Sequence, residues 1–322
     1  MKAMGPGRSC PASYHFGAAA LAREEAVHAE CLYAVGGVYG NPFALDALIA
    51  LAASERHPPL MVFNGDFHWF DTDPGTFSAV SRAVLGHTAL RGNVETELGS
   101  ETSGAGCGCA YPDFVGDAEV ERSNRILARL RATARALPGE STRLAALPMR
   151  LLVEVGGLRI GIVHGDAESL AGWGFSQEAL SAAGAAALAP WFDAARVRVF
   201  ASSHSCLPVA ADLAASAGRC ALINNGAAGM PNFAGTRCGV ITRIDAGPAP
   251  VPALYGLELE GVRIEALPLH YDHTAWVRAF LRDWPPGSDA HVSYFRRLED
   301  GPVYRPEQAA RGGFRLRQRA VA

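Results

Sequence analysis

Four polar side chains follow four apolar, strand-like segments, each at the point where the segment ends. Asp66 follows "LMVFNG", Asn93 follows "TALRG", His164 follows "LRIGIV" and His204 follows "VRVFASS". Open α/β sheets place their functional sites beyond the carboxyl ends of their strands, so the four loops can converge. Carboxylate, amide and imidazole groups form an oxygen and nitrogen ligand set that suits Zn, Mn or Fe. We therefore expect these four residues to build a divalent-metal site.

Each of these residues has a simpler explanation when it is taken alone. Asp66 and Asn93 are residue types that occur often in turns, and a single histidine is more often structural than metal-binding. The argument for a metal site rests on finding all four at strand ends of one chain.

The elements that would position them alternate between strands and helices in the first half of the chain. Residues 31–37, 60–66 and 88–93 are strand-like, and residues 41–55 and 75–86 have apolar residues at helical spacing. The Asn-Pro pair at the start of 41–55 suits a helix N-terminus. Strands separated by helices predict parallel pairing in an α/β layer.

The second half of the chain is richer in strands. Residues 116–138 form the clearest helix, with Asp117 as its expected cap. Two apolar runs around Gly156-Gly157 predict a hairpin within 150–166. Further strands are expected at 197–202, 220–225, 239–244 and 262–269. These patterns predict two sheets within one domain.

The composition excludes several classes of protein. Of the 322 residues, 49% are hydrophobic and 19% charged, and the formal net charge is -3, which gives no reason to expect a nucleic-acid partner. The longest apolar runs, such as 45–53, are too short to span a bilayer, so no membrane partner is expected. The first residues lack the apolar core of a secretion signal, and seven scattered cysteines suit free thiols in a cytoplasmic protein.

The order of the motifs resembles that of the calcineurin-like metallophosphoesterase superfamily, in particular its small bacterial phosphodiesterase-like branch. That family carries Asp-x-His-Gly-Asn, Gly-Asp, Gly-Asn-His-Asp/Glu, His-Gly-Asp, Gly-His-x-His and Asn-Pro-Gly-Ser in this order. The corresponding segments here are "GVYGN" (37–41), "GDFHWFDTDP" (65–74), "GNVE" (92–95), "HGD" (164–166), "SHSC" (203–206) and "NNGAAGMPN" (224–232). Their order and spacing carry the resemblance more than any single motif does.

The resemblance implies a four-layer αββα sandwich with two mixed sheets flanked by helices. It places this domain at residues 29–285, between a flexible N-terminal segment (1–28) and a C-terminal extension (286–322) that ends in a basic, mobile tail. It also implies two metal ions about 3.5–4 Å apart that activate a water and clamp the phosphoryl oxygens. Asp66 matches the bridging ligand, and Asn93, His164 and His204 complete the second site. Asp66, Asn93 and His164 are accordingly the expected catalytic residues.

The first metal site departs from the family pattern. Its aspartate falls on Gly37, its first histidine on Tyr39 and its last histidine on Cys206. The histidine that donates a proton or contacts phosphate in the family falls on Val94. These departures affect the positions where the family's chemistry is done.

Two interpretations of the departures remain open at this stage. In one, the protein is a pseudoenzyme that binds phosphate or a nucleotide at its single intact site. In the other, the first site is rebuilt, because His68 lies two residues after Asp66 and would share its side of an extended chain. Cys206, Cys107 and Cys109, with Asp113 nearby, would then supply further ligands suited to zinc or iron.

The function expected from the sequence is that of a metal-dependent phosphodiesterase or phosphatase homologue, with full or reduced activity. It would use one or two Mn, Zn or Fe ions per chain and a metal-activated water. The partner would be a small phosphorylated molecule or a nucleotide. The alternatives are the non-catalytic regulator and metal-dependent chemistry outside phosphoryl transfer. Trp69 and Phe70 would form either an apolar wall beside the site or part of the core.

Overall fold

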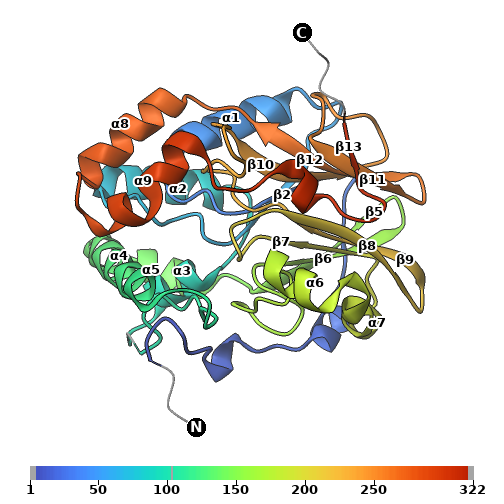
Figure 1. Cartoon of the computed structure of the whole chain (residues 1–322), viewed down its shortest axis with the longest axis horizontal. Helices are drawn as coiled ribbons and strands as arrows, with labels where there is room; N and C mark the ends of the chain where they lie inside the picture. Colours follow the sequence, from blue (N-terminus) through green and yellow to red (C-terminus); the bar gives the residue numbers. More distant parts are fainter. Residues whose placement is uncertain (1–4, 103, 318–322) are drawn as a thin grey trace.

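The computed structural model describes residues 5–102 and 104–317, and it contains two mixed sheets packed face to face with helices on both outer sides (Figure 1). The seven-stranded sheet has the order β13-β11-β12-β10-β2-β3-β4. Its strands are β2 (Cys31–Val35), β3 (Leu60–Asn64), β4 (Thr88–Leu90), β10 (Gly239–Asp245), β11 (Tyr255–Leu259), β12 (Val262–Leu269) and β13 (Arg315–Leu316). The predicted αββα sandwich is confirmed.

The six-stranded sheet has the order β1-β5-β6-β7-β9-β8. Its strands are β1 (Val27–His28), β5 (Arg150–Val155), β6 (Leu158–Val163), β7 (Val199–Ser202), β8 (Val209–Ala215) and β9 (Gly218–Asn224). The predicted hairpin joins β5 to β6 through Gly156 and Gly157, whose φ values of 55° and 83° lie in the left-handed region that favours glycine.

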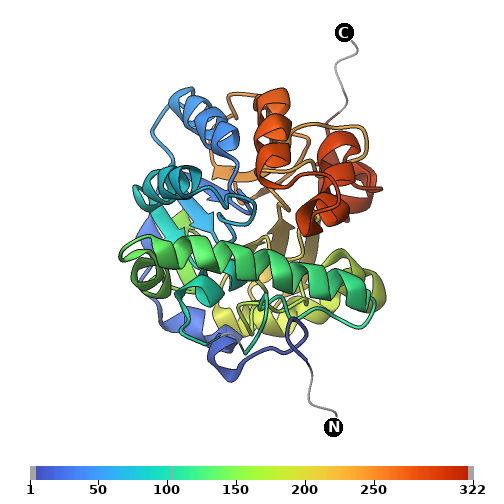
Figure 2. The same ribbon diagram turned by 90° about the vertical axis from the view of Figure 1, so that its left-hand side faces the viewer.

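The helices cover the two outer faces and one end of the sandwich. They are α1 (Pro42–Ala53), α2 (Pro74–Leu85), α3 (Asn93–Gly99), α4 (Asp117–Ala136), α5 (Glu140–Ala145), α6 (Gln177–Ala183), α7 (Ala189–Ala195), α8 (His273–Asp283), α9 (Asp289–Asp300) and α10 (Pro306–Ala309), with short 3-10 helices at Ala12–Tyr14, Ala18–Arg23 and Ala185–Leu188. Figure 2 shows α4 as the long helix that crosses one side of the molecule. Among the described residues, none of these helices combines the length and the apolar character needed to cross a bilayer.

Strand alternation explains how the layers hold together. Along β2, Leu32 and Ala34 face the core between the sheets, whereas Tyr33 and Val35 face the core beneath the helices. β2, β3 and β4 pair in parallel, as the alternation of strands and helices predicted. Parallel strands end at the same sheet edge, so this edge positions the loops of Asp66 and Asn93. The parallel pair β6 and β7 does the same for His164 and His204 at the edge of the six-stranded sheet.

The predicted start of α1 is confirmed, whereas the predicted cap of α4 is not. Asn41 caps α1, since its side chain accepts the backbone N–H of Ala44 at 3.1 Å. Asp117 does not cap α4, because the N-cap is Gly116 and Asp117 is the first helical residue. Its carboxylate instead pairs with Arg8 at 2.6 Å.

The terminal segments take part in the fold more than the sequence suggested. In residues 5–28, which we expected to be flexible, Tyr14 and Leu21 are buried and β1 pairs with β5. In the C-terminal extension, α9 packs against α4, and β13 adds an edge strand beside β11. The domain limits stay a prediction, and residues 318–322 of the basic tail lie outside the described residues.

Candidate metal centre

Four loops at the carboxyl ends of strands meet at one buried point. Asp66 follows β3, Asn93 begins α3 after β4, His164 follows β6 and His204 follows β7. The ligand atoms of Asp66, His164 and His204 all lie within 4.8 Å of one another, and all three side chains are buried. The structure thus brings together the residues that the strand-end pattern singled out.

Backbone carbonyls fix the hydrogen positions of the two histidines. Nδ1 of His164 lies 2.8 Å from the carbonyl oxygen of Asn64, and Nε2 of His204 lies 3.0 Å from that of Cys109. Because a carbonyl only accepts, these nitrogens carry the hydrogens of the neutral rings. The remaining nitrogens, Nε2 of His164 and Nδ1 of His204, then direct lone pairs toward each other across 3.1 Å.

Asn93 and Asp66 add oxygen lone pairs at the same point. The amide nitrogen of Asn93 donates to the carbonyl of Cys107 at 2.9 Å, which turns its oxygen toward Nε2 of His164 at 3.1 Å. A carboxylate oxygen of Asp66 lies 3.4 Å from the same nitrogen. With neutral rings, four acceptors converge without a hydrogen among them, an arrangement that a bound cation would satisfy. These residues therefore fit a divalent metal ion.

The pKa values of the two histidines are shifted in opposite directions. Burial is the largest single effect and lowers the pKa of His164, but the charge and hydrogen bond of Asp66, together with the Asn64 carbonyl and Glu95, raise it overall. Burial and the nearby His164 lower the pKa of His204 to about 3, so this ring stays neutral and able to ligate. Burial opposes ionisation of Asp66, yet His164 lowers the pKa of that carboxyl. In the metal-free protein a proton on His164 is the competitor of the metal.

Glu95 organises the loops that carry the ligands. Its buried carboxylate accepts the backbone N–H groups of Asp66 at 2.8 Å, Gly92 at 2.9 Å and His68 at 3.3 Å. A Cβ on Gly92 would lie 2.3 Å from Oδ1 of Asp66, so only glycine permits this close approach. The sequence did not indicate this role, although Glu95 is the last residue of the "GNVE" segment.

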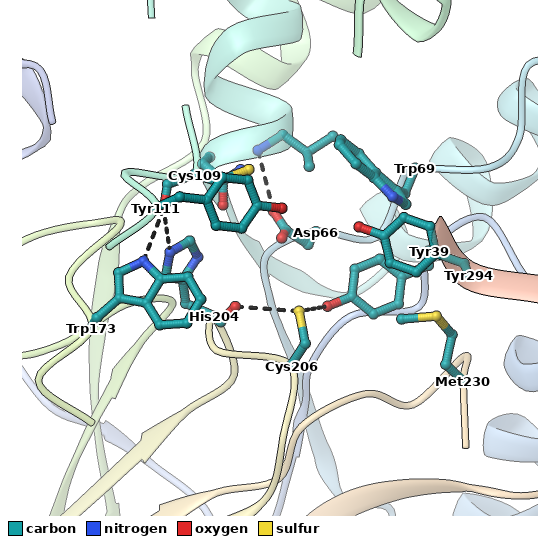
Figure 3. Close-up of a pocket in the computed structure, with 12 residues that line it drawn as sticks. Tyr39, Asp66, Trp69, Cys109, Tyr111, Trp173, His204, Cys206, Met230 and Tyr294 are labelled. Carbon is teal, nitrogen blue, oxygen red and sulfur yellow. Dashed lines mark hydrogen bonds between the residues drawn. The ribbon is translucent and has the colours of Figure 1, made fainter. Parts of the chain in front are cut away.

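The side chain of Tyr39 fills the space beside Gly37, where the family pattern has its first metal site. The Tyr39 ring covers Gly37, where a Cβ would lie only 2.3 Å from ring carbons, and its hydroxyl lies 2.8 Å from the sulfur of Cys206 (Figure 3). Gly37, Tyr39 and Cys206, the three departures assigned to the first metal site of the family, therefore form one packed unit. A side chain at position 37 and the Tyr39 ring cannot occupy this space together.

His68, which we predict as a lower-ranked metal ligand, lies outside the group formed by Asp66, His164 and His204. Its ring nitrogens contact Asp71 at 2.5 Å and Ser81 at 3.0 Å, and its ring stacks on Phe77. Asp66 and His68 do not share one side of an extended chain, because the chain turns sharply at Asp66, whose φ is 54°. Ser81, His68 and Asp71 have the order of a hydrolase triad, but burial of all three side chains shuts out substrate.

The predicted thiolate ligands also stay outside the metal cluster. Cys206 contacts Tyr39, and its thiol lies 3.3 Å from the carbonyl of His204. Cys109 lines the cavity beside the site, while Cys107 is fully buried and Asp113 is exposed. Burial raises the pKa of the Cys109 and Cys206 thiols, which disfavours the thiolate form. Among the described residues, no cysteine joins the Asp66–His164–His204 group, so the rebuilt thiolate site is not formed.

A second acidic cluster in the described chain does not offer a metal site. Cys31, Glu55 and Asp245 lie close enough to share an ion. The guanidinium of Arg243 already occupies their centre, at 2.6 Å from Glu55 and 2.9 Å from Asp245. This cluster is a buried ion-pair network.

A small aromatic cavity of about 50 Å³ opens beside Asp66, with room for roughly three to five water molecules. Of its lining residues in the described chain, only Asp66 is an acidic or basic side chain charged at neutral pH. The guanidinium of Arg297 lies nearby but donates to the carbonyl oxygens of Cys206 and Pro231. Figure 3 shows the aromatic side chains around the cavity: Tyr39, Trp69, Tyr111, Trp173 and Tyr294.

Three of the five aromatic side chains of this lining had no signal in the sequence: Tyr111, Trp173 and Tyr294. Trp69 lines the cavity, which agrees with the interpretation of an apolar wall. Phe70 packs in the core instead, with its ring centroid 5.1 Å from that of Phe280. Tyr111 and Trp173 come from irregular loops. Tyr294 comes from α9, in the segment that we expected to lie outside the domain.

Comparison with known proteins relates the chain to others through its fold. No protein-family model and no curated protein matches the sequence. A hypothetical protein from Pyrococcus horikoshii OT3 has a similar structure, with a TM-score of 0.57, 14% identity, and coverage of 86% of this chain and 100% of that one. A metallophosphoesterase from Sphaerobacter thermophilus is also similar, with a TM-score of 0.52, 17% identity, and coverage of 85% and 99%. At these identities the likeness establishes a shared fold.

Proposed function

We propose that this chain, which has the metallophosphoesterase fold, is a phosphoric ester hydrolase that works with one divalent metal ion. Asp66, Asn93, His164 and His204 would hold a Mn, Zn or Fe ion. The observation that carries the proposal is the convergence of four acceptor atoms beside a cavity. The first site of the family pattern is closed by Tyr39, which supports one ion rather than two.

The residues of the chain have separate tasks in this proposal. When bound, the ion supplies positive charge that polarises a phosphoryl oxygen and lowers the pKa of water. Asp66 is held for ligation because one carboxylate oxygen accepts the N–H of Val94 at 3.2 Å at the start of α3. The aromatic walls limit the water in the cavity and so strengthen the electrostatic interactions inside it. The ester's phosphoryl group would enter from the cavity side.

A second candidate function is non-catalytic binding of a phosphorylated molecule or nucleotide as a regulator. It is favoured by Val94, an apolar side chain at the family's proton-donor position, and by the closed first site. A general acid contributes about 10²–10⁴-fold to rate, so its loss without replacement would cost about 3–5 kcal/mol of transition-state stabilisation. The chain would then bind the phosphorylated molecule without hydrolysing it efficiently.

Metal analysis combined with an ester assay tests the proposal. The purified chain is expected to hold one ion of Mn, Zn or Fe and to hydrolyse bis(4-nitrophenyl) phosphate. Asp66→Asn is expected to lose both the ion and the turnover. Asp113→Asn is the matched control, because it removes a carboxylate that is exposed and outside the cluster. One bound ion without turnover above the Asp66→Asn background would favour the regulator over the hydrolase.

A further inference from the structure

The backbone is strained at three residues that line the cavity. Tyr39, Asp66 and Cys206 have φ values of 55°, 54° and 59°, and they are three of the six non-glycine residues with positive φ in the described chain. Such conformations persist only where the surroundings impose them, and they concentrate at functional sites. This strain points to a task for Tyr39 and Cys206 beyond the filling of space.

Tyr39 is tied directly to the loop that carries Asp66. The backbone N–H of Tyr39 donates to the carbonyl of Asp66 at 3.2 Å, and the carbonyl of Tyr39 accepts the N–H of Phe70 at 3.3 Å. The ring lies over Gly37, and its hydroxyl contacts the sulfur of Cys206 at 2.8 Å. The position of the hydroxyl relative to Asp66 is therefore fixed from the backbone and from the ring.

The position that carries the proton donor in the family pattern has no donor here. Val94 is apolar, and no lysine or arginine is among the described lining residues. Tyrosine hydroxyls are the remaining oxygen donors of the lining, and that of Tyr111 is engaged with Ser123 at 3.1 Å. Of the other two tyrosines, only Tyr39 has its hydroxyl oriented by a partner in the cavity wall (Figure 3).

We propose that the Tyr39 hydroxyl, oriented by Cys206, is the catalytic donor that protonates the leaving oxygen of the ester. The proposal rests on the proposed hydrolase function. Water forms the new P–O bond, the P–O bond to the leaving alcohol breaks, and the leaving oxygen keeps the electron pair and takes the Tyr39 proton. A proton released by the water returns to the Tyr39 oxygen, so each turnover consumes one ester and one water.

Leaving groups of different acidity test this role. The metal-loaded full chain is assayed with bis(4-nitrophenyl) phosphate, whose leaving group departs readily as an anion, and with diphenyl phosphate, whose less acidic phenol needs a proton. Tyr39→Phe keeps the ring over Gly37 and removes only the hydroxyl, so metal content and thermal midpoint are expected to stay at wild-type values. The kcat for diphenyl phosphate is expected to fall about 100-fold or more, and the nitrophenyl ester much less.

Tyr294→Phe is the matched control, because it removes another cavity hydroxyl and is expected to keep the wild-type ratio of the two rates. Equal losses on both esters, or no loss, in Tyr39→Phe would overturn the role of Tyr39 while leaving the hydrolase function intact. A wild-type chain that binds one ion and cleaves neither ester would overturn both proposals. If Tyr39→Phe misfolds, Cys206→Ala must show the same preferential loss on diphenyl phosphate, and an unchanged ratio there refutes the role.

Discussion

The packing of Tyr39 over Gly37 predicts a strong energetic coupling between these two positions. In Gly37→Ala, the new Cβ would lie 2.3 Å from two carbons of the Tyr39 ring, where ordinary carbon contacts lie at about 3.5–4.0 Å. The ring has little room to retreat, because it is 3% exposed and its hydroxyl contacts Cys206. Overpacking of this kind costs about 1–3 kcal/mol of unfolding free energy.

The same substitution behaves differently once the ring is removed. In a Tyr39→Ala background the methyl group of Gly37→Ala no longer meets the ring. The φ of Gly37 lies outside the left-handed region, so the change there is expected to stabilise the protein by about 0.4–1 kcal/mol through the unfolded chain. The difference between the two backgrounds gives a coupling of about 1.5–4 kcal/mol.

Equilibrium urea unfolding followed by circular dichroism measures this coupling on four proteins: wild type, the two single variants and the double variant. All four are measured with a chelator, so that metal binding does not contribute. An equal cost of Gly37→Ala in both backgrounds would refute the conclusion that Tyr39 closes the first metal site. A cost within about 0.5 kcal/mol of zero in the wild-type background would refute it as well.

Cys206→Ala is expected to leave the bound metal at one ion per chain by elemental analysis; a lower count would make its sulfur a ligand. Glu95→Gln places a donor against the backbone N–H groups that Glu95 now accepts, so calorimetry should show about 10–100-fold weaker metal affinity. His68→Ala leaves the buried Asp71 without its partner and should cost about 3–5 kcal/mol in urea unfolding at unchanged metal content. Metal-free protein should be most stable near pH 6.5. Because the pKa of His164 is raised in the folded protein, the free energy of unfolding rises as the pH falls toward 6.5. His204 has a pKa of about 3 when folded, so the unfolded chain takes up its proton first. The free energy of unfolding therefore falls by about 1.4 kcal/mol per pH unit below 6.5. Urea unfolding across pH 4–9 that shows no maximum would contradict this assignment.

The sequence was sufficient for the order of elements and for the strand-end positions of the candidate metal ligands. Apolar runs of strand length that alternate with helical patterns specify parallel pairing, and parallel strands end at one edge of a sheet. Asp66 and Asn93 follow parallel strands of one sheet, and His164 and His204 follow parallel strands of the other, so each pair follows from topology, whereas the meeting of the two pairs depends on how the sheets pack. Local pattern and chain connectivity carry this information, and both can be read from the order of the residues.

Tertiary structure decided what surrounds the cluster. The positive φ of Asp66 turns His68 away from the site, against the alternation of an extended chain. The Tyr39 ring lies over Gly37, a contact that the sequence did not indicate and that only packing specifies. Tyr294 reaches the cavity because α9 packs against α4, far from any motif. Loop conformation and side-chain packing arise from contacts distant in sequence, so the closure of the space beside Gly37 and the chemistry of the cavity wall became apparent only in three dimensions.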